Sequence, residues 1–299
     1  MPTLEFFEKP SLKRTIFLAA WEGWPDAAES ATRAARELAR QLPATKFASI
    51  DPEEFYDFSE QRPEVETAPD GSRTLSWPSN EFYYWKNDDP EGRDVVILVG
   101  TEPNLRWRRY AEQVTTVISE CNVELMITLG ALLDSVPHTR SPRVTGSSVD
   151  LDLGEGFETV QYPPPTYEGP SGMTSVISEE LSKIGVKHAG IWGHAPHYVQ
   201  VAHNPAITVA LLKEVQRFLP KQLDLTPMEQ ESEEFVENLQ RALEDQKDIE
   251  GYVRQLEERY DSEEERRGRP EPAELVQELE EFLRSQRQDD SEEDGKGQA

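Results

Sequence analysis

Cysteine is almost absent from this 299-residue sequence, which contains only Cys121. One thiol cannot form an intramolecular disulfide, and it cannot supply the ligands of a multi-cysteine zinc site. Cys121 lies between a stretch with helical spacing and the apolar segment Leu125–Gly130. A free cysteine in such a position is typical of a protein core. We therefore predict a buried, inert thiol rather than a catalytic nucleophile.

Positive charge and long apolar runs are both scarce. The chain has 31 lysines and arginines against 58 aspartates and glutamates, a net charge of −27. Nucleic acids and anionic membrane surfaces repel such a chain, so neither is an expected partner. The longest apolar run, Leu125–Leu133, falls short of the ~20 residues that span a bilayer. Residues 1–10 carry glutamates where a signal peptide carries basic residues. We expect no membrane segment and a cytoplasmic location.

Motifs for nucleotide binding and for nucleophilic catalysis are also missing. No glycine-rich loop ends in Lys-Ser or Lys-Thr, and no GxGxxG sequence follows a predicted strand. The nearest candidate is LVGTEP at 98–103, where Glu102 would repel an anion. The segment GPSG at 169–172 lacks the GxSxG spacing of a nucleophile elbow, so we interpret Ser171 as a helix cap. We expect no cofactor.

Three of the five histidines, His194, His197 and His203, fall within ten residues. Pro196 argues against a helix there, and no carboxylate lies inside the cluster to complete a catalytic zinc site. The sequence therefore predicts an exposed loop after a strand rather than a metal centre.

The segment 136–146 gathers positive charge, and two interpretations of it stay open. It contains His138, Arg140 and Arg143 in a chain otherwise poor in cations. In one interpretation, Arg140 holds an anionic group of a partner, such as a C-terminal carboxylate, because loops at strand ends are common ligand sites. In the other, the arginines neutralise nearby carboxylates.

Short apolar runs alternate with stretches of helical spacing up to about residue 219. The run Val95–Val99 has no polar alternation, which predicts a strand buried on both faces. This order predicts an α/β fold of three layers, with a mostly parallel sheet flanked by helices. The predicted strands are 15–19, 47–50, 95–99, 125–129 and 189–192, and the predicted helices are 27–42, 105–119, 173–184 and 205–219.

Two segments depart from this alternation. Residues 51–87 are rich in proline and aromatic residues, and predict an excursion of short antiparallel strands that includes EFYDF at 54–58 and EFYYW at 81–85. Residues 229–299 hold 25 of the 58 acidic side chains but only 10 of the 31 basic ones. We predict an α/β domain, an acidic extension of amphipathic helices and a disordered tail, over 1–225, 229–287 and 288–299 respectively.

Eight motifs occur in order along the predicted α/β domain. They are WEGWPDAAESA at 21–31, DPEEFYDFSEQRP at 51–63, WPSNEF at 77–82, GTEPNLRW at 100–107, GALLDSVPHTR at 130–140, VTGSS at 144–148, YEGPSG at 167–172 and PHYV at 196–199. In these motifs the chain resembles the proteasome assembly chaperone 2 family, in its actinobacterial-type branch. The acidic helical extension also looks like that branch's C-terminal extension. His194 departs from the pattern, which has a small or apolar residue there.

The resemblance implies a phosphorylase/hydrolase-like α/β fold, a homo-oligomer such as a trimer, and a link to the assembly of proteasome α-subunits. The aromatic residues of the first 107 positions fit a protein-binding role, since tyrosine and tryptophan supply wide contact area at low entropy cost. We predict that WEGW at 21–24 and the EFYDF and EFYYW segments line a subunit interface, although a core role for half of these rings is the alternative. The candidate interface or ligand-binding residues are Trp21, Trp24, Asp26, Glu102, Arg106, Trp107, His138, Arg140, Tyr167, Glu168, His197 and Tyr198.

Three functions from different classes are consistent with the sequence. The favoured one is a protein-binding scaffold or assembly chaperone without an active site. A second is a hydrolase or ATP-dependent ligase on the same fold, which requires a pocket that holds Asp26, Glu102, His138, Arg140 and Glu168. The third is a structural protein whose tail helices form a coiled coil.

Overall fold

The computed structural model describes residues 3–148, 150, 160–161, 168–243 and 247–267. The chain divides into two compact units, Met1–Asp245 and Gln246–Ala299. Tyr167, residues 268–287 of the predicted helical extension and the predicted tail over 288–299 lie outside the described residues. No helix in the described part is long and apolar enough to cross a membrane.

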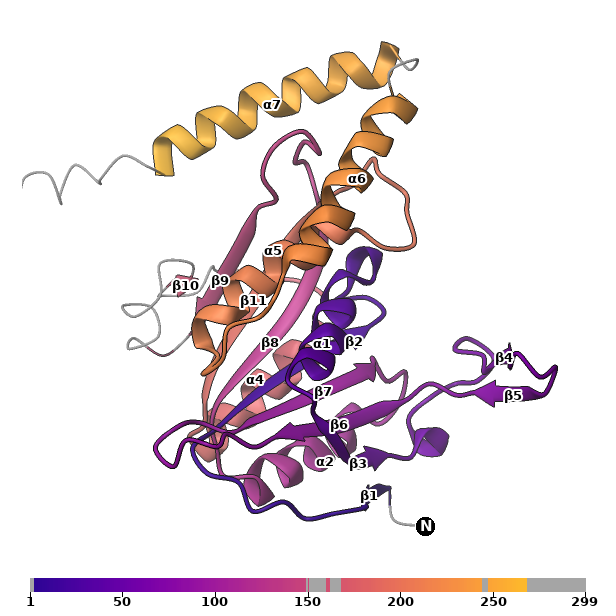
Figure 1. The fold of residues 1–299 in the computed structure, drawn as a ribbon, viewed down its shortest axis with the longest axis vertical. Coiled ribbons are helices and arrows are strands. Elements are labelled where there is room, and N and C mark those ends of the chain that lie inside the picture. Colours follow the sequence, from indigo (N-terminus) through magenta and orange to yellow (C-terminus); the bar gives the residue numbers. More distant parts are fainter. Residues whose placement is uncertain (1–2, 149, 151–159, 162–167, 244–246, 268–299) are drawn as a thin grey trace, which may run out of the picture. The chain divides into compact units, whose positions relative to one another are not determined.

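The first unit is built on a mixed sheet, which has nine strands in the part that the structure describes (Figure 1). Its four central strands β7, β2, β8 and β11 run parallel, while β6, β3 and β1 on one side add in antiparallel pairing and β9 pairs antiparallel with β11 on the other. In sheet order the strands are β1 (Leu4–Phe6), β3 (Thr45–Ile50), β6 (Asn80–Trp85), β7 (Val95–Thr101), β2 (Thr15–Glu22), β8 (Val123–Asp134), β11 (Lys187–Pro196), β9 (Val144–Ser148) and β10 (Val160–Gln161).

Helices cover both faces of this sheet. One face packs against α1 (Ser30–Gln41) and α5 (Pro205–Val215), and the other against α2 (Trp107–Glu120) and α4 (Met173–Ile184). Every residue of β7 is buried, because its alternate side chains enter the two cores. The predicted α/β fold of three layers is confirmed, and so are the five predicted strands. Short 3₁₀ helices at Ala27–Glu29, Pro52–Glu54 and Gln216–Phe218 complete the unit.

The segment 51–87 contains short antiparallel strands, as predicted, but they do not form one separate excursion. EFYYW forms most of β6, which lies inside the main sheet between β3 and β7. EFYDF is not a strand, since it follows the 3₁₀ helix at Pro52–Glu54 into a turn. Only β4 (Glu64–Thr67) and β5 (Arg73–Ser76) form a separate hairpin, which projects from the body in Figure 1. Within EFYYW, the ring of Phe82 packs edge-on against Phe17 and Phe47 in the core on one face of the sheet.

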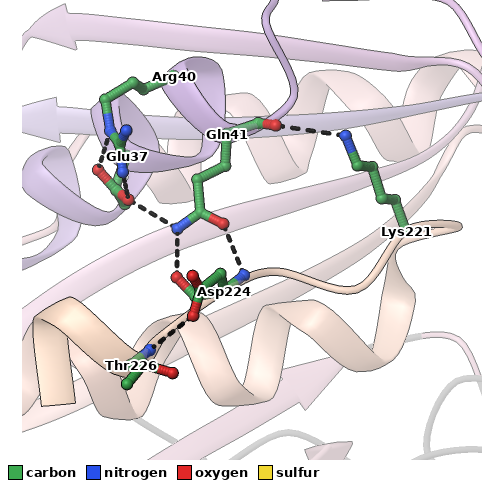
Figure 2. Close-up of polar contacts among 6 residues, drawn as sticks. All are labelled: Glu37, Arg40, Gln41, Lys221, Asp224 and Thr226. Carbon is green, nitrogen blue, oxygen red and sulfur yellow. Dashed lines mark hydrogen bonds and ion pairs between the residues drawn. The ribbon is translucent and has the colours of Figure 1, made fainter.

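Helix α6 (Thr226–Leu243) belongs to the first compact unit, which ends at Asp245. The Gln41 side chain at the end of α1 holds the loop before α6 (Figure 2). Its Nε2 donates to the Asp224 carbonyl and its Oε1 accepts from the Asp224 N–H, both at 2.8 Å. Ion pairs from Arg33 to Glu231 and from Lys213 to Glu229, each 2.7 Å, then tie α6 to α1 and α5.

The second unit contains one described helix, α7 (Lys247–Arg267). Its exposed ion pairs join Glu250 to Arg254 and Arg259 to Glu263 at i,i+4 spacing. Each such pair stabilises an isolated helix by about 0.2–0.5 kcal/mol. Val253 and Leu256, which lie three residues apart on one face of the helix, are its buried apolar positions.

Candidate protein-contact surface

The loop after β2 occupies the centre of the edge where the parallel strands end. Gly23 begins it with φ +115°, a conformation that side-chain-bearing residues rarely adopt. The Pro25 carbonyl then accepts a hydrogen bond from the Ala131 N–H of β8 at 2.8 Å, and the Glu22 carbonyl accepts one from the Glu102 N–H after β7 at 2.8 Å. Backbone bonds to both neighbouring strands therefore fix the path of this loop.

Asp26 is buried in the same loop and caps α1. Its carboxylate accepts hydrogen bonds from the Ala31 N–H at 2.6 Å, the Thr32 N–H at 3.1 Å and the Thr32 hydroxyl at 2.5 Å. Burial raises the pKa of the Asp26 carboxyl, and these three bonds oppose that rise. The helix needs this cap because Glu29, its N-cap residue, makes no side-chain cap bond. The arrangement gives Asp26 a structural role at the base of the surface.

Glu102 connects the loop to α4. One carboxylate oxygen accepts a hydrogen bond from the Met173 N–H at 2.7 Å, and the backbone N–H of Trp24 also bonds to the carboxylate. Burial raises the pKa of Glu102, while those two N–H groups lower it. A Cβ added at Gly172 would lie 3.2 Å from the Trp24 ring and 3.0 Å from Glu102. The sequence YEGPSG thus supplies the glycine that lets the indole lie against the start of α4.

Trp24 and Trp77 are the two exposed tryptophans of the predicted aromatic surface. The Trp24 side chain is 65% exposed and that of Trp77 is 45% exposed. Phe58 packs against Trp77 with its ring centre 4.9 Å away, edge to face. Trp107 is half-buried, and its Nε1 donates to the Pro103 carbonyl at 2.6 Å. These three tryptophans contribute to the outer face of the folded chain.

Trp21 was predicted at an interface, but it is fully buried within the protomer. Its Nε1 donates to the Tyr110 hydroxyl at 2.7 Å, and that hydroxyl donates to Asn80 Oδ1 at 2.6 Å. Asn80 Nδ2 donates in turn to the Tyr56 hydroxyl, which donates to the Thr101 carbonyl at 2.6 Å. Burial raises the pKa of Tyr56 and of Tyr110. This chain of hydrogen bonds fixes the end of β7 from inside the core.

Other rings of the predicted interface are buried too. Phe55 and Phe82 have no exposed surface, and Tyr56 has almost none. They fill the layer between the antiparallel strands and α2, where Phe55 meets Tyr110 edge-on at 5.5 Å. The alternative of a core role is therefore correct for these residues. Phe82 is buried because β6 is a strand of the main sheet, whereas Phe55 is buried against Tyr110 of α2.

Three arginines, Arg106, Arg108 and Arg109, lie at the start of α2. Arg106 has a left-handed conformation, φ +54°, and is followed by the exposed Arg108 and Arg109. Arg106 and Arg109 both contact the Glu54 carboxylate, at 2.5 and 2.6 Å. Only Arg106 was named from the sequence. The run RWRR, in a chain so poor in cations, is the signal that points to the other two.

The loops after β8 and β11 bring together three predicted residues. The Tyr198 hydroxyl accepts from the His138 N–H at 2.9 Å and lies 2.7 Å from His138 Nδ1. His197 donates its backbone N–H to the Asp134 carbonyl at 3.1 Å. Arg140 and His138 line one shallow hollow with residues of α5 and α6. Asp26, Glu102 and the exposed Glu168 are not among the residues that line it, so this hollow is not the pocket that the hydrolase or ligase hypothesis requires.

Within the histidine cluster, His194 connects three strands. His194 Nδ1 lies 2.8 Å from an Asp134 carboxylate oxygen, and its Nε2 lies 2.9 Å from the Thr145 hydroxyl, so the ring links β8, β11 and β9. Hydrogen bonds lower the pKa of Asp134 against the effect of burial, most strongly the bond from His194. His203 points instead toward Glu231 of α6 at 3.7 Å. Within the described ranges, no three His, Cys, Asp or Glu side chains are placed to hold a metal ion.

Comparison with known proteins places this fold. The model of the PAC2 family matches residues 20–243. A PAC2 family protein from Streptomyces avermitilis is 31% identical, with a TM-score of 0.72 over 80% of this chain and 99% of that chain. The proteasome-assembly chaperone homologue Rv2125 of Mycobacterium tuberculosis is also 31% identical, with a TM-score of 0.70 over the same shares. The archaeal proteasome activator PbaB of Pyrococcus furiosus, at 22% identity and TM-score 0.66 over 80% of this chain and 98% of that chain, shares the fold. No curated protein matches the chain. This chain belongs to the PAC2 family.

Proposed function

We propose that this protein is a cytoplasmic protein-binding scaffold or assembly chaperone that acts in proteasome assembly as a homo-oligomer. Membership of the PAC2 family and the likeness to a proteasome-assembly chaperone homologue support the link to the proteasome. The observation that carries a binding role is Trp24, a 65% exposed indole on a loop whose backbone bonds to β8 and to Glu102 after β7.

Rigid presentation of Trp24 favours binding because little conformational entropy is lost when the ring meets a partner. Ala28 and Glu29, four and five residues further on, both have left-handed backbone conformations, with φ +53° and +47°. Such conformations cost about 1–3 kcal/mol each and persist where the surroundings impose them. Here Asn204 of the loop before α5 donates its N–H to the Ala28 carbonyl at 3.1 Å. The strained loop therefore holds Trp24 in one place.

The β4–β5 hairpin offers a second apolar surface. Val65 lies directly opposite Leu75, and the two side chains are 50% and 57% exposed. Trp77 lies two residues after Leu75, which puts it on the same side of an extended chain. A two-stranded hairpin is marginally stable alone. Cover from a partner would stabilise this one.

The test is capture of purified proteasome α-subunits by the immobilised full chain. Wild type is expected to retain them, and Trp24→Ala to lose at least about ten-fold in affinity, the loss typical of a central aromatic contact. Phe7→Ala is the matched control and should bind as wild type. It removes another exposed ring, which directly follows β1 at the other end of the fold's antiparallel strands. Equal capture by wild type and Trp24→Ala would overturn the role of this loop. No capture by the wild-type chain would overturn the link to the proteasome.

A further inference from the structure

Three arginines cluster at the start of α2 on this acidic molecule. Arg106, Arg108 and Arg109 fall within four residues, and the first turn of α2 contains no acidic side chain. The exposed Leu105 precedes them, 47% exposed. We name the surface of Leu105 and these three arginines the arginine face.

Helix stability does not account for this arrangement. Positive side chains near the amino end of a helix oppose its dipole, by about 0.3–1 kcal/mol each. The left-handed backbone of Arg106 adds a further cost. Glu54 supplies one negative charge to Arg106 and Arg109 together. Arg108 makes no ion pair in the described part of the chain. It interacts electrostatically with Glu179 of α4, but the main partner of Glu179 is Lys183. The three arginines of the face thus outnumber the one carboxylate with which they form ion pairs.

Carboxylates without cationic partners occur on α6 of the same unit. Glu233 and Glu234 are exposed, and neither makes an ion pair among the described residues. Their neighbours Glu229, Glu231 and Glu237 are each paired with a basic side chain. The half-buried Phe235 and Val236 follow directly. The α6 surface of Glu233 to Val236 therefore combines negative charge with apolar area, as the arginine face combines positive charge with Leu105.

We propose that the arginine face of one copy of this chain contacts the α6 surface of a second copy. Two protomers with a net charge of −27 repel each other in most orientations, and the contact that offsets the repulsion must place cations of one against carboxylates of the other. The two surfaces differ, so the contact is head-to-tail and closes a ring when the rotation permits. This inference rests on the homo-oligomeric part of the proposed function and specifies the surfaces that form the oligomer.

The first measurement is the assembly state of the full chain by light scattering and sedimentation. Arg108→Glu with Arg109→Glu is expected to raise the dissociation constant at least about ten-fold, because like charges then face each other across the contact. Lys86→Glu with Arg93→Glu makes the same change in net charge at the opposite end of β7 and should leave assembly unchanged. If the wild-type chain is a monomer, or if both pairs of substitutions weaken assembly equally, the proposal is wrong.

Charge exchange identifies the second surface. Glu233→Arg with Glu234→Arg should also weaken assembly at least about ten-fold, and a chain with all four substitutions should regain the wild-type assembly state because the contact is restored with reversed sign. Thermal melts check the fold, and Arg108→Gln alone replaces the double variant if that variant does not fold. Unchanged assembly after reversal on α6, or no recovery in the combined chain, would overturn the contact. A variant that keeps its assembly but loses α-subunits shows instead that the arginine face binds the foreign partner.

This experiment and the capture experiment fail independently. If wild type assembles but fails to capture α-subunits, the proteasome link is wrong and the head-to-tail contact is unaffected. If Trp24→Ala captures as wild type, only the role of Trp24 is wrong. If capture is intact and assembly is unchanged by all four charge substitutions, only the proposed head-to-tail contact is overturned.

Discussion

The indole of Trp21 and the phenol of Tyr110 share a hydrogen bond of 2.7 Å in a fully buried part of the core. The Tyr110 hydroxyl also donates to Asn80, so one oxygen joins β2, α2 and β6. A buried polar network stabilises a protein only when each of its members is satisfied. Replacement of that single hydroxyl is therefore informative.

Tyr110→Phe should lower the free energy of unfolding by about 1–3 kcal/mol, because Trp21 Nε1 and Asn80 Oδ1 each lose a partner inside the core. Urea denaturation followed by fluorescence measures the change. Tyr84→Phe is the control, since its hydroxyl makes only long contacts, 3.2 and 3.3 Å, with the exposed Glu8. A stability of Tyr110→Phe equal to that of the control would show that the network contributes nothing.

Gly100→Ala should be more damaging than Tyr110→Phe. A Cβ at this position would lie 2.0 Å from Asn80 Oδ1 and 3.2 Å from the Trp21 ring, so the same network has to move. We expect a loss above about 3 kcal/mol, or failure to accumulate as folded protein. Gly251→Ala on α7 meets no atom within 4 Å and should stabilise its helix by about 0.5–1 kcal/mol. Thermal melts of both variants decide the matter.

Gln41→Ala should loosen α6 without unfolding the sheet. The substitution removes both hydrogen bonds to the Asp224 backbone and leaves the bonds between Glu37 and Arg40 in place (Figure 2). Amide hydrogen exchange in residues 224–231 should become faster, by roughly five-fold or more for a loss of about 1 kcal/mol. Exchange in β7 should not change. Faster exchange everywhere would mean a global loss of stability instead.

His188 should make the protein less stable in mild acid. Burial lowers its pKa from the ordinary 6.5 to about 4, against a small opposing effect of Asp150. The unfolded chain therefore takes up a proton at pH values where the folded chain does not, and stability falls as the pH drops from 6.5 toward 4. The loss between pH 6.5 and 5 should reach about 1.5 kcal/mol. Urea titrations of wild type and His188→Gln measure it, and parallel pH profiles would contradict the assignment.

The strands and layers of the α/β unit were predictable because the signal is local. Val95–Val99 contains only apolar residues, and a strand of that kind has to be covered on both faces. The place of EFYYW was not predictable in the same way. Phe82 and Trp85 look alike in the sequence, and only the pairing of β6 with both β3 and β7 makes the first fully buried.

The candidate site shows the same limit. Trp24 lies between Gly23 and Pro25 in the loop and is exposed, whereas Trp21, three residues earlier, lies on the strand itself and is enclosed. A count of aromatic residues cannot separate the two. The hydrogen bonds of Glu102 to the Trp24 loop and to α4 join residues about 70 to 80 positions apart, and no local pattern encodes them.

One edge of the main sheet is short, since its outermost strand β1 has three residues. Unpaired strand edges can recruit identical edges from other molecules and grow into fibrils. An edge of three residues provides few free backbone groups for such growth. Association of protomers along this edge should therefore depend on side-chain contacts rather than on continued pairing of strands.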